Sequence, residues 1–331
     1  MILAGDLGGT KTLLGLFEQG RAGVRSLREQ IYRSAEHANF EDILDAFVPQ
    51  HEARPKLAAA CFGVPGAVFD GRSHATNLPW TLEESALSRR IGAPVRLLND
   101  LEATAYGMLF LAPAQLHVLQ AGGRERLRGN VAVIAAGTGL GEAMLYFDGK
   151  QHHPVASEGG HADFAPQDDL EIELLRWLRT RFKGHVSYER ILAGPGLTNV
   201  YQFLKEKGGY RESEFVAQKL AQGDPNVAIS DLALAGGDAL SEDALALFSR
   251  VYGAETGNLA MRWLATGGVF VGGGIAPKIL PFLERGGFLE RFCDKGRFTP
   301  LMKSLELSVS LEPRTALLGA AHYAQRLQTP E

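Results

Sequence analysis

The sequence predicts an α/β protein built from two lobes of similar topology. Short apolar segments typical of strands alternate with segments of helical periodicity along the chain. The length of 331 residues exceeds one typical domain of roughly 100–200 residues. An apolar strand, a Gly/Thr turn and a second apolar strand occur at 1–17 and again at 130–149. We therefore expect two such lobes facing each other across a cleft.

Composition narrows the functional classes. The chain is 45% hydrophobic and 22% charged, with a formal net charge of −4, so it has no basic footprint for nucleic acid. Two cysteines, Cys61 and Cys293, are too few for a disulfide framework or a structural zinc site, which fits a reducing cytoplasm. No apolar run reaches the ~18 residues of a membrane span, and the N-terminus lacks the basic start of a signal peptide. We expect a cytoplasmic protein without a nucleic-acid or membrane partner.

Strands are expected where apolar runs end in Gly or Pro, and helices where apolar residues recur every three to four positions. Besides the two hairpins, the expected strands are 57–66, 94–100, 116–122 and 267–274. The expected helices are 41–49, 82–91, 101–111, 169–182, 187–206, 213–221, 225–235, 241–265 and 315–327. This alternation is typical of largely parallel sheets covered by helices.

The first hairpin turn is rich in groups that suit phosphate. Gly8 and Gly9 allow positive φ and leave backbone N–H groups uncovered, which favours phosphate oxygens. Thr10 adds a hydroxyl, Lys11 a cation, and Asp6 a carboxylate able to hold hydrated Mg²⁺. An ordinary hairpin with a Gly-Gly turn explains the same residues equally well.

The second hairpin turn, 136–141, contains the glycines of a dinucleotide-binding fingerprint. That fingerprint must open a helix, whereas the following EAMLYFDG segment has the pattern of a strand, so a Rossmann site is excluded. The sequence also has no GxxxxGK[ST] motif, which excludes a P-loop. Gly137 and Thr138 therefore indicate a second turn that could bind phosphates.

Asn99 and Asp100 follow an expected buried strand and begin an expected helix. One interpretation is structural: Asn99 with Glu102 three residues later forms a capping box, and Asp100 complements the helix dipole. The other is catalytic, because a carboxylate at the carboxyl end of a strand is well placed as a general base. The two are compatible, since a cap would fix the direction of the carboxylate.

Three further segments combine polar groups with glycine. Glu158 and His161 flank a Gly-Gly pair and can hydrogen-bond vicinal hydroxyls, or can belong to an ordinary polar loop. Glu189 lies where a helix begins, so N-terminal helix chemistry is its alternative explanation. Gly273 and Gly274 end a strand and either admit a nucleoside or permit a close backbone crossing.

In combination these segments resemble the bacterial glucokinase family, within the superfamily of sugar kinases, Hsp70 and actin. The matching stretches appear in family order at 5–12, 97–107, 135–145, 157–166, 188–201 and 267–280. The resemblance implies two lobes of the ribonuclease H-like, actin-like ATPase fold. It implies a small lobe over 1–110, a large lobe over 111–300, and a helix within about 301–331 that returns to the small lobe.

The resemblance also implies that ATP and glucose are the substrates, that Mg²⁺ accompanies ATP, and that the chain forms a homodimer. By similarity, the residues that would bind glucose hydroxyls are Asn99, Asp100, Glu158, His161 and Glu189, with Asp100 the base toward the 6-hydroxyl. Those that would line the phosphates are Gly8, Gly9, Thr10 and Thr138, and those beside adenosine are Gly273 and Gly274. The clustered cysteines of the zinc motif in the related ROK kinases are missing from 162–185, so no zinc site is expected.

Other functions fit the same fold. Another hexose or N-acetylhexosamine kinase would carry the same motifs. A sugar-responsive repressor would need an added DNA-binding domain, whereas the first strand here begins at Ile2. A filament or chaperone ATPase would have no use for the sugar-type set around Asn99-Asp100 and Glu158/His161. These considerations favour phosphorylation of glucose.

Overall fold

The computed structural model describes residues 1–20, 23–48, 56–76, 78–123, 127–210, 212–285 and 287–328. Contacts divide the chain into two units. The first comprises Met1–Gln115, Ala143–Ala156 and Glu312–Glu331, and the second comprises Leu116–Glu142 and Ser157–Leu311. The segment Ala143–Ala156 thus belongs to the same unit as the N-terminal residues. The predicted lobe boundary at residue 110 did not anticipate this.

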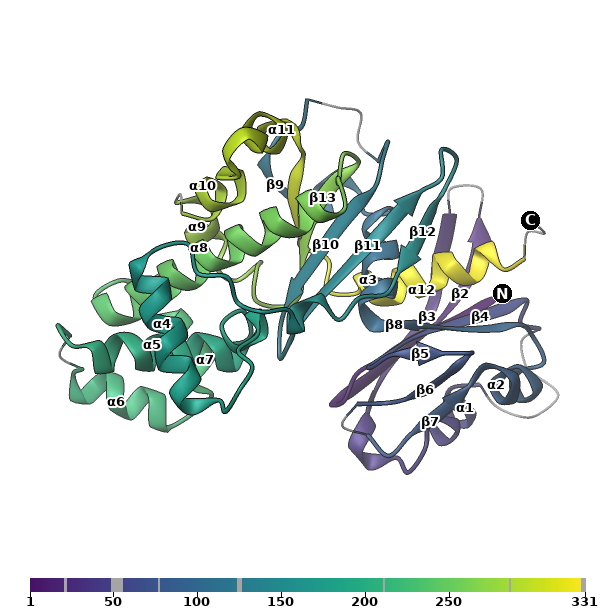
Figure 1. The fold of residues 1–331 in the computed structure, drawn as a ribbon. Helices are drawn as coiled ribbons and strands as arrows, with labels where there is room; N and C mark the ends of the chain where they lie inside the picture. The colour runs from purple at the N-terminus through teal and green to yellow at the C-terminus, as the bar shows by residue number, and fades with distance from the viewer. Residues whose placement is uncertain are drawn as a thin grey trace. The chain divides into compact units, whose positions relative to one another are not determined.

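The first unit is built on a five-stranded sheet in the order β3-β2-β1-β4-β8 (Figure 1). Its strands are β1 (Ile2–Leu7), β2 (Lys11–Gly20), β3 (Gly23–Arg33), β4 (Ala59–Val64) and β8 (Val95–Asn99). β1 pairs antiparallel with β2 and parallel with β4, and β4 pairs parallel with β8. The carboxyl ends of β1, β4 and β8 therefore meet at one edge of the sheet.

Both faces of this sheet are covered, because side chains alternate along each strand. On one face, Leu3 and Phe62 pack with α1 (Phe40–Phe47) and α2 (Glu84–Ile91). On the other, Ile2 and Ala4 pack with α3 (Asp100–Met108) and α12 (Thr315–Arg326). A small sheet of β5 (Val68–Phe69), β6 (Arg72–His74) and β7 (Thr81–Glu83) completes the unit.

Helices α3 and α12 approach each other through glycines. A Cβ at Gly107 would overlap the carbonyl of Thr315, and a Cβ at Gly319 would overlap the carbonyl of Ala103. This contact fixes α3, whose first residue is Asp100, against the sheet. Within the range 301–331 the returning helix is confined to α12, because α11 (Thr299–Ser304) and β14 (Leu307–Ser310) occupy the earlier part.

A second sheet has six strands in the order β12-β11-β10-β13-β14-β9. They are β9 (Leu116–Gln120), β10 (Val131–Ala136), β11 (Leu140–Phe147), β12 (His152–Val155), β13 (Gly268–Gly272) and β14. β10, β13 and β14 are parallel, so that Ala135 lies opposite Gly272 where β10 and β13 end.

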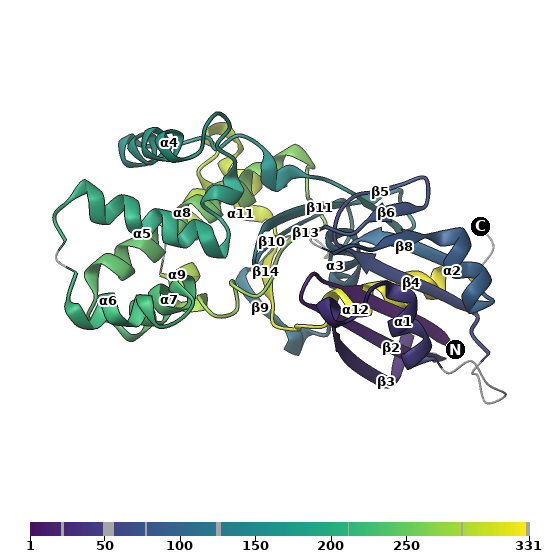
Figure 2. The same cartoon turned by 90° about the horizontal axis from the view of Figure 1, so that it is seen from below.

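The remaining mass of the second unit is helical (Figure 2). The helices are α4 (Asp169–Arg181), α5 (Gly194–Lys207), α6 (Glu214–Ala221), α7 (Pro225–Ala235), α8 (Ala239–Arg262), α9 (Leu280–Glu284), α10 (Phe288–Cys293) and α11. α8 is the central one and is buried along most of its length between its neighbours. Along the described part of the chain, no helix is both long and apolar enough to cross a membrane.

The expected helix over 187–206 is interrupted. A 3-10 turn covers Tyr188–Arg190, and α5 begins only at Gly194, because Pro195 is well suited to the first turn of a helix but not to its interior. The expected helix over 82–91 likewise begins at Glu84, after β7. Strand β3 and the small sheet were not anticipated, since they are short or largely exposed.

Candidate active site

The first glycine turn is shaped by a buried serine. The Gly8 N–H donates to the carbonyl of Lys11 at 2.9 Å, which closes the hairpin. Ser34 donates from its hydroxyl to the Gly8 carbonyl at 2.6 Å and from its N–H to the Thr10 carbonyl at 3.1 Å. The hydroxyls of Thr12 and Ser34 are 3.0 Å apart, and both side chains are buried. Ser34 thus donates to two carbonyl oxygens of the turn, while residues 9–11 stay exposed to solvent.

The turn does not use the positive φ that its two glycines would allow. Neither Gly8 nor Gly9 is among the described glycines with positive φ. The requirement at Gly8 is one of space, because a Cβ there would lie 2.9 Å from the Lys11 carbonyl oxygen.

Asp6 and Asp100 lie at neighbouring strand ends across a glycine. Asp6 pairs in register with Gly63 of β4, and a Cβ at Gly63 would lie 3.6 Å from the Cα of Asp100. Burial, together with the negative charge of Asp100, raises the pKa of Asp6 to about 6. The missing side chain at Gly63 therefore lets two carboxylates gather where β1 and β8 end, which sequence reasoning did not foresee.

The predicted capping box at α3 is confirmed. Asn99 accepts from the Leu101 N–H at 2.9 Å, while the Glu102 carboxylate accepts from the Asn99 N–H at 2.9 Å. The Asn99 amide also donates to the Gly66 carbonyl at 3.0 Å. Asp100 accepts from the Leu101 N–H at 2.8 Å. The cap holds Asp100 in the first turn of the helix, so the structural interpretation holds and leaves the catalytic one available.

The second glycine turn is held by an acidic side chain. The Gly137 N–H donates to the Gly139 carbonyl at 2.8 Å, and the Gly194 N–H donates to the Gly137 carbonyl at 2.9 Å. The Leu140 N–H donates to Oε2 of Glu189 at 3.0 Å. A Cβ at Gly139 would lie 2.6 Å from that same oxygen. Glu189 therefore packs against the backbone of the turn.

Two of the three predicted sugar-binding residues of the second unit lie together. Nδ1 of His161 is 3.9 Å from Oε1 of Glu189, and the His161 side chain is 58% exposed. Glu158 is exposed and immediately precedes the 3-10 turn Gly159–His161. His185, which the sequence did not single out, lies with Nε2 2.7 Å from the His161 carbonyl oxygen and Nδ1 2.8 Å from Asp163. The segment from His161 to Asp163 is thereby tied down.

The glycines that end β13 have different roles. Gly273 has a φ of +79°, and a Cβ there would overlap the Ala136 carbonyl, so the close backbone crossing considered from the sequence is present. The Ile275 N–H donates to that carbonyl at 3.2 Å, which brings the Gly273-Gly274 segment beside Gly137. Gly274 faces open space, as a nucleoside would require.

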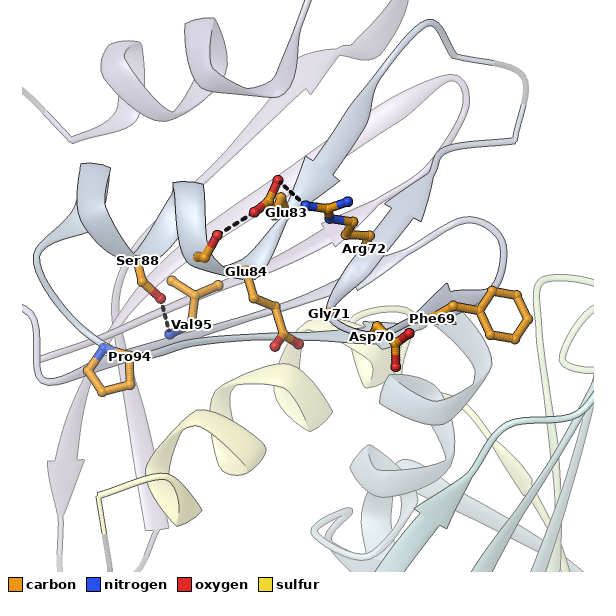
Figure 3. Close-up of a pocket in the computed structure, with 10 residues that line it drawn as sticks. Phe69, Asp70, Gly71, Arg72, Glu83, Glu84, Ser88, Pro94 and Val95 are labelled. Carbon is orange, nitrogen blue, oxygen red and sulfur yellow. Dashed lines mark hydrogen bonds and ion pairs between the residues drawn. The ribbon is translucent and has the colours of Figure 1, made fainter.

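A hollow of about 760 Å³ in the first unit is lined by none of the predicted residues (Figure 3). Most of its polar groups are paired among themselves or with the backbone, such as Glu83 with Arg72 at 3.4 Å and Glu84 with the Leu97 N–H at 2.8 Å. Its lining therefore offers no set of uncommitted polar groups to a ligand. Among the residues that the structure describes, no three His, Cys, Asp or Glu side chains gather as metal ligands.

Fold and residues together define a class: a sugar kinase of the actin-like ATPase fold, with two glycine turns and a capped aspartate at a strand end. The sequence profile of the Glucokinase family matches residues 3–327, so the chain belongs to the glucokinase family. The predicted α/β fold class and the predicted glucokinase-family enzyme are thereby confirmed.

Individual relatives agree with this assignment. A curated glucokinase from Trichormus variabilis is 38% identical and covers 99% of each chain. The crystal structure of a glucokinase from an Antarctic psychrotroph superposes with a TM-score of 0.83, at 28% identity and 98% coverage of each chain. A ROK family glucokinase from Streptomyces griseus, solved in complex with glucose and AMPPNP, has a TM-score of 0.66. It is 24% identical and covers 98% of this chain and 99% of its own, so it supports the fold.

Proposed function

We propose that this chain transfers the γ-phosphoryl group of ATP to the 6-hydroxyl of glucose and forms glucose 6-phosphate. The family match supports the activity, and the Streptomyces griseus relative binds glucose together with an ATP analogue. The observation that carries the assignment of roles is the placement of Asp100. It directly follows a buried strand, is fixed by a capping box, and lies near the half-buried Asp6 at the end of the first hairpin strand.

Asp100 is the proposed general base. Phosphoryl transfer passes through a loose transition state, so most of the catalysis is positioning and electrostatic stabilisation. The Leu101 N–H and the first turn of α3 hold the Asp100 carboxylate in one direction. In that direction it orients the 6-hydroxyl of glucose for in-line attack on the γ-phosphorus and accepts its proton.

The two turns are the proposed phosphate-binding elements. In the first, Gly8, Gly9, Thr10 and Lys11 supply N–H groups, a hydroxyl and a cation. In the second, Gly137 and Thr138 supply the same kind of donors. Gly273 and Gly274 are proposed to lie beside the adenosine, of which Gly274 has the open space that this requires.

Mg²⁺ is the proposed companion of ATP. The Asp6 carboxyl fits it, because burial and the charge of Asp100 create a site that a cation would neutralise. One or two carboxylates are sufficient, since this ion takes its remaining ligands from water and phosphate oxygens. When bound, the ion neutralises charge on the phosphates; Asp6 would hold it through water.

The remaining polar set is proposed to bind the other hydroxyls of glucose. Glu189 and His161 are already adjacent, and Glu158 is one turn away along the chain. Asn99 offers an amide whose direction is fixed by Gly66 and Leu101. Carboxylates, an imidazole and an amide together supply both donors and acceptors, as vicinal hydroxyls require.

Two further properties are part of the proposal. We expect a cytoplasmic enzyme, which agrees with Cys61 and Cys293 being buried free thiols. We expect a homodimer by family resemblance, which size-exclusion chromatography with light scattering would measure directly.

The decisive experiment measures ATP-dependent phosphorylation of glucose, mannose, fructose, N-acetylglucosamine and N-acetylmannosamine by the purified chain. The proposal requires kcat/KM to be highest for glucose, with the product phosphorylated at the 6-position. A higher value for another sugar would assign the chain to that substrate instead. Binding of a sugar without consumption of ATP would point to a regulator.

A further inference from the structure

The second unit contains a buried ionic network that the proposed mechanism does not use. Glu142 of β11 is 1% exposed and Glu255 of α8 is 0% exposed. Arg262, one of the last residues of α8, forms ion pairs with both carboxylates, at 3.3 Å from Oε2 of Glu142 and closer to Glu255. Buried carboxylates are rare because removing a charge from water costs free energy. A buried pair beside one arginine therefore suggests a specific role.

One end of the network supports the turn that carries His161. A Cβ at Gly159 would overlap Oε2 of Glu142, so the carboxylate packs directly under the backbone of Gly159. The Gly159 N–H is itself held by the Ser157 hydroxyl at 2.9 Å. A change in the position or charge of Glu142 therefore acts on the turn between Glu158 and His161.

The other end of the network reaches the residue next to Glu189. The Asn258 amide donates to Oε2 of Glu255 at 3.0 Å and to the hydroxyl of Tyr188 at 3.2 Å. Tyr188 is buried and packs edge-to-face on Phe164. Glu255 thus fixes Tyr188, and through the chain it fixes Glu189. Both segments that bear the predicted sugar-binding residues of this unit rest on the same pair of carboxylates.

The charge of Glu255 affects the ionisation of Glu142. Burial, with the charge of Glu255 as the second cause, raises the pKa of Glu142 to about 8. Three other titratable groups face Glu142 and Glu255. Tyr188 and Tyr252 are neutral at pH 7, and Lys295 lies beside Glu255. Burial and the neighbouring Glu255 thus favour the protonated form of Glu142, and we expect Glu142 to ionise only in alkaline solution.

We propose that Glu142, Glu255 and Arg262 are positioning residues for glucose, which hold the Gly159–His161 turn and the Tyr188–Glu189 segment in binding geometry. The inference rests on the proposed function for the identity of the sugar. A negative charge on Glu142 would lie directly under the Gly159 backbone, and its repulsion from Glu255 would displace that backbone.

The test measures glucose affinity from pH 7 to pH 9.5, by titration of the full-length protein in a calorimeter and by KM in the ATP-dependent assay. For the natural sequence we expect the Kd of glucose to rise about tenfold across this range, while the KM for ATP stays constant. Glu142→Gln keeps the shape of the neutral carboxyl and cannot ionise, so its Kd should stay flat. Glu255→Gln should behave in the same way and serves if the first variant fails to fold.

Glu290→Gln is the matched control, because it makes the same chemical change at an exposed position on α10 of the same unit. Its glucose affinity should follow the natural sequence at every pH. A flat Kd in the natural sequence, or an alkaline rise that persists in both glutamine variants, would overturn the inference. Absence of glucose phosphorylation at pH 7 would instead contradict the proposed function, and the calorimetric titration would still test the network.

Discussion

The two glycine turns share a sequence pattern but are fixed by different chemistry. The turn at Gly8 is held by neutral groups, since the Ser34 hydroxyl donates to the Gly8 carbonyl and the Ser34 N–H donates to the Thr10 carbonyl. The turn at Gly137 and Gly139 is held by a carboxylate, because Glu189 accepts from the Leu140 N–H and lies against Gly139. Glu189 is also a proposed ligand of glucose. The second turn therefore links a proposed phosphate-binding element to a proposed sugar-binding residue, whereas the support of the first turn involves none of the proposed sugar-binding residues.

The largest effect is expected at the end of the first sheet, where the proposed base lies. Asp100→Asn should lower kcat by about 10²–10⁴-fold, the usual contribution of general base catalysis, because the amide cannot accept the proton. Glucose binding should persist, since the amide keeps the hydrogen-bonding shape. Steady-state kinetics combined with calorimetric titration of glucose measure both quantities. Near-normal turnover would remove Asp100 from the role of base.

The contact between the second turn and the Glu189 carboxylate can be disrupted by adding one methyl group at position 139. Gly139→Ala would push against Oε2 of Glu189 and should raise the KM for glucose by about 10–100-fold, the cost of losing a charged hydrogen bond. Gly137→Ala is the matched change, since its Cβ would face open space. It should leave the KM for glucose within about twofold and act on ATP instead. Equal effects of the two variants on glucose would refute the coupling.

The half-buried carboxylate of Asp6, beside the first turn, is expected to affect the pH dependence of stability. Because the pKa of Asp6 is raised to about 6, its neutral form is favoured on folding, and the associated stability is lost as the pH rises through 6. Without nucleotide or Mg²⁺, Asp6→Asn should therefore be more stable than the natural sequence by about 1–2 kcal/mol at pH 7.5, with the difference closing near pH 4. Urea denaturation at both pH values measures this. A pH-independent difference would contradict it.

The smallest effect is expected from the hydroxyl support of the first turn. Ser34→Ala leaves the Gly8 carbonyl without its donor and should raise the KM for ATP by about 3–10-fold, with the KM for glucose unchanged. Ser85→Ala, which removes an exposed serine paired with Glu83, is the control for loss of a hydroxyl. An effect on glucose equal to that on ATP would show that the first turn is coupled as well.

The local features of the site were predictable from the sequence. The capping box at Asn99 and Glu102 requires only residues three apart, and the two hairpins require only an apolar pattern around glycines. Helix ends were predicted within a few residues where an N-cap or proline marks them, as at α7, which begins at Pro225. Short-range rules are sufficient for such features because the interacting groups are neighbours in the chain.

The supports of the site were not predictable, because they depend on contacts between distant residues. Ser34 lies 26 positions from Gly8, and Arg262 lies 120 positions from Glu142. The sequence gives Gly63 no distinguishing feature. Only the pairing of β1 with β4 shows that it lies between Asp6 and Asp100. No alternation of apolar and polar residues marks such positions, and Glu142 and Glu255 are acidic residues where the pattern alone favours apolar ones.

The contact between α3 and α12 has a consequence for synthesis on the ribosome. The face of the first sheet that carries Ile2, Ala4 and Phe17 is covered in part by α12, which is translated after the other described elements. That face stays open to solvent until Gly319 reaches Ala103. A nascent chain can therefore bury the core of the second unit first, and β1 and β2, although they precede that unit in the chain, finish folding after it.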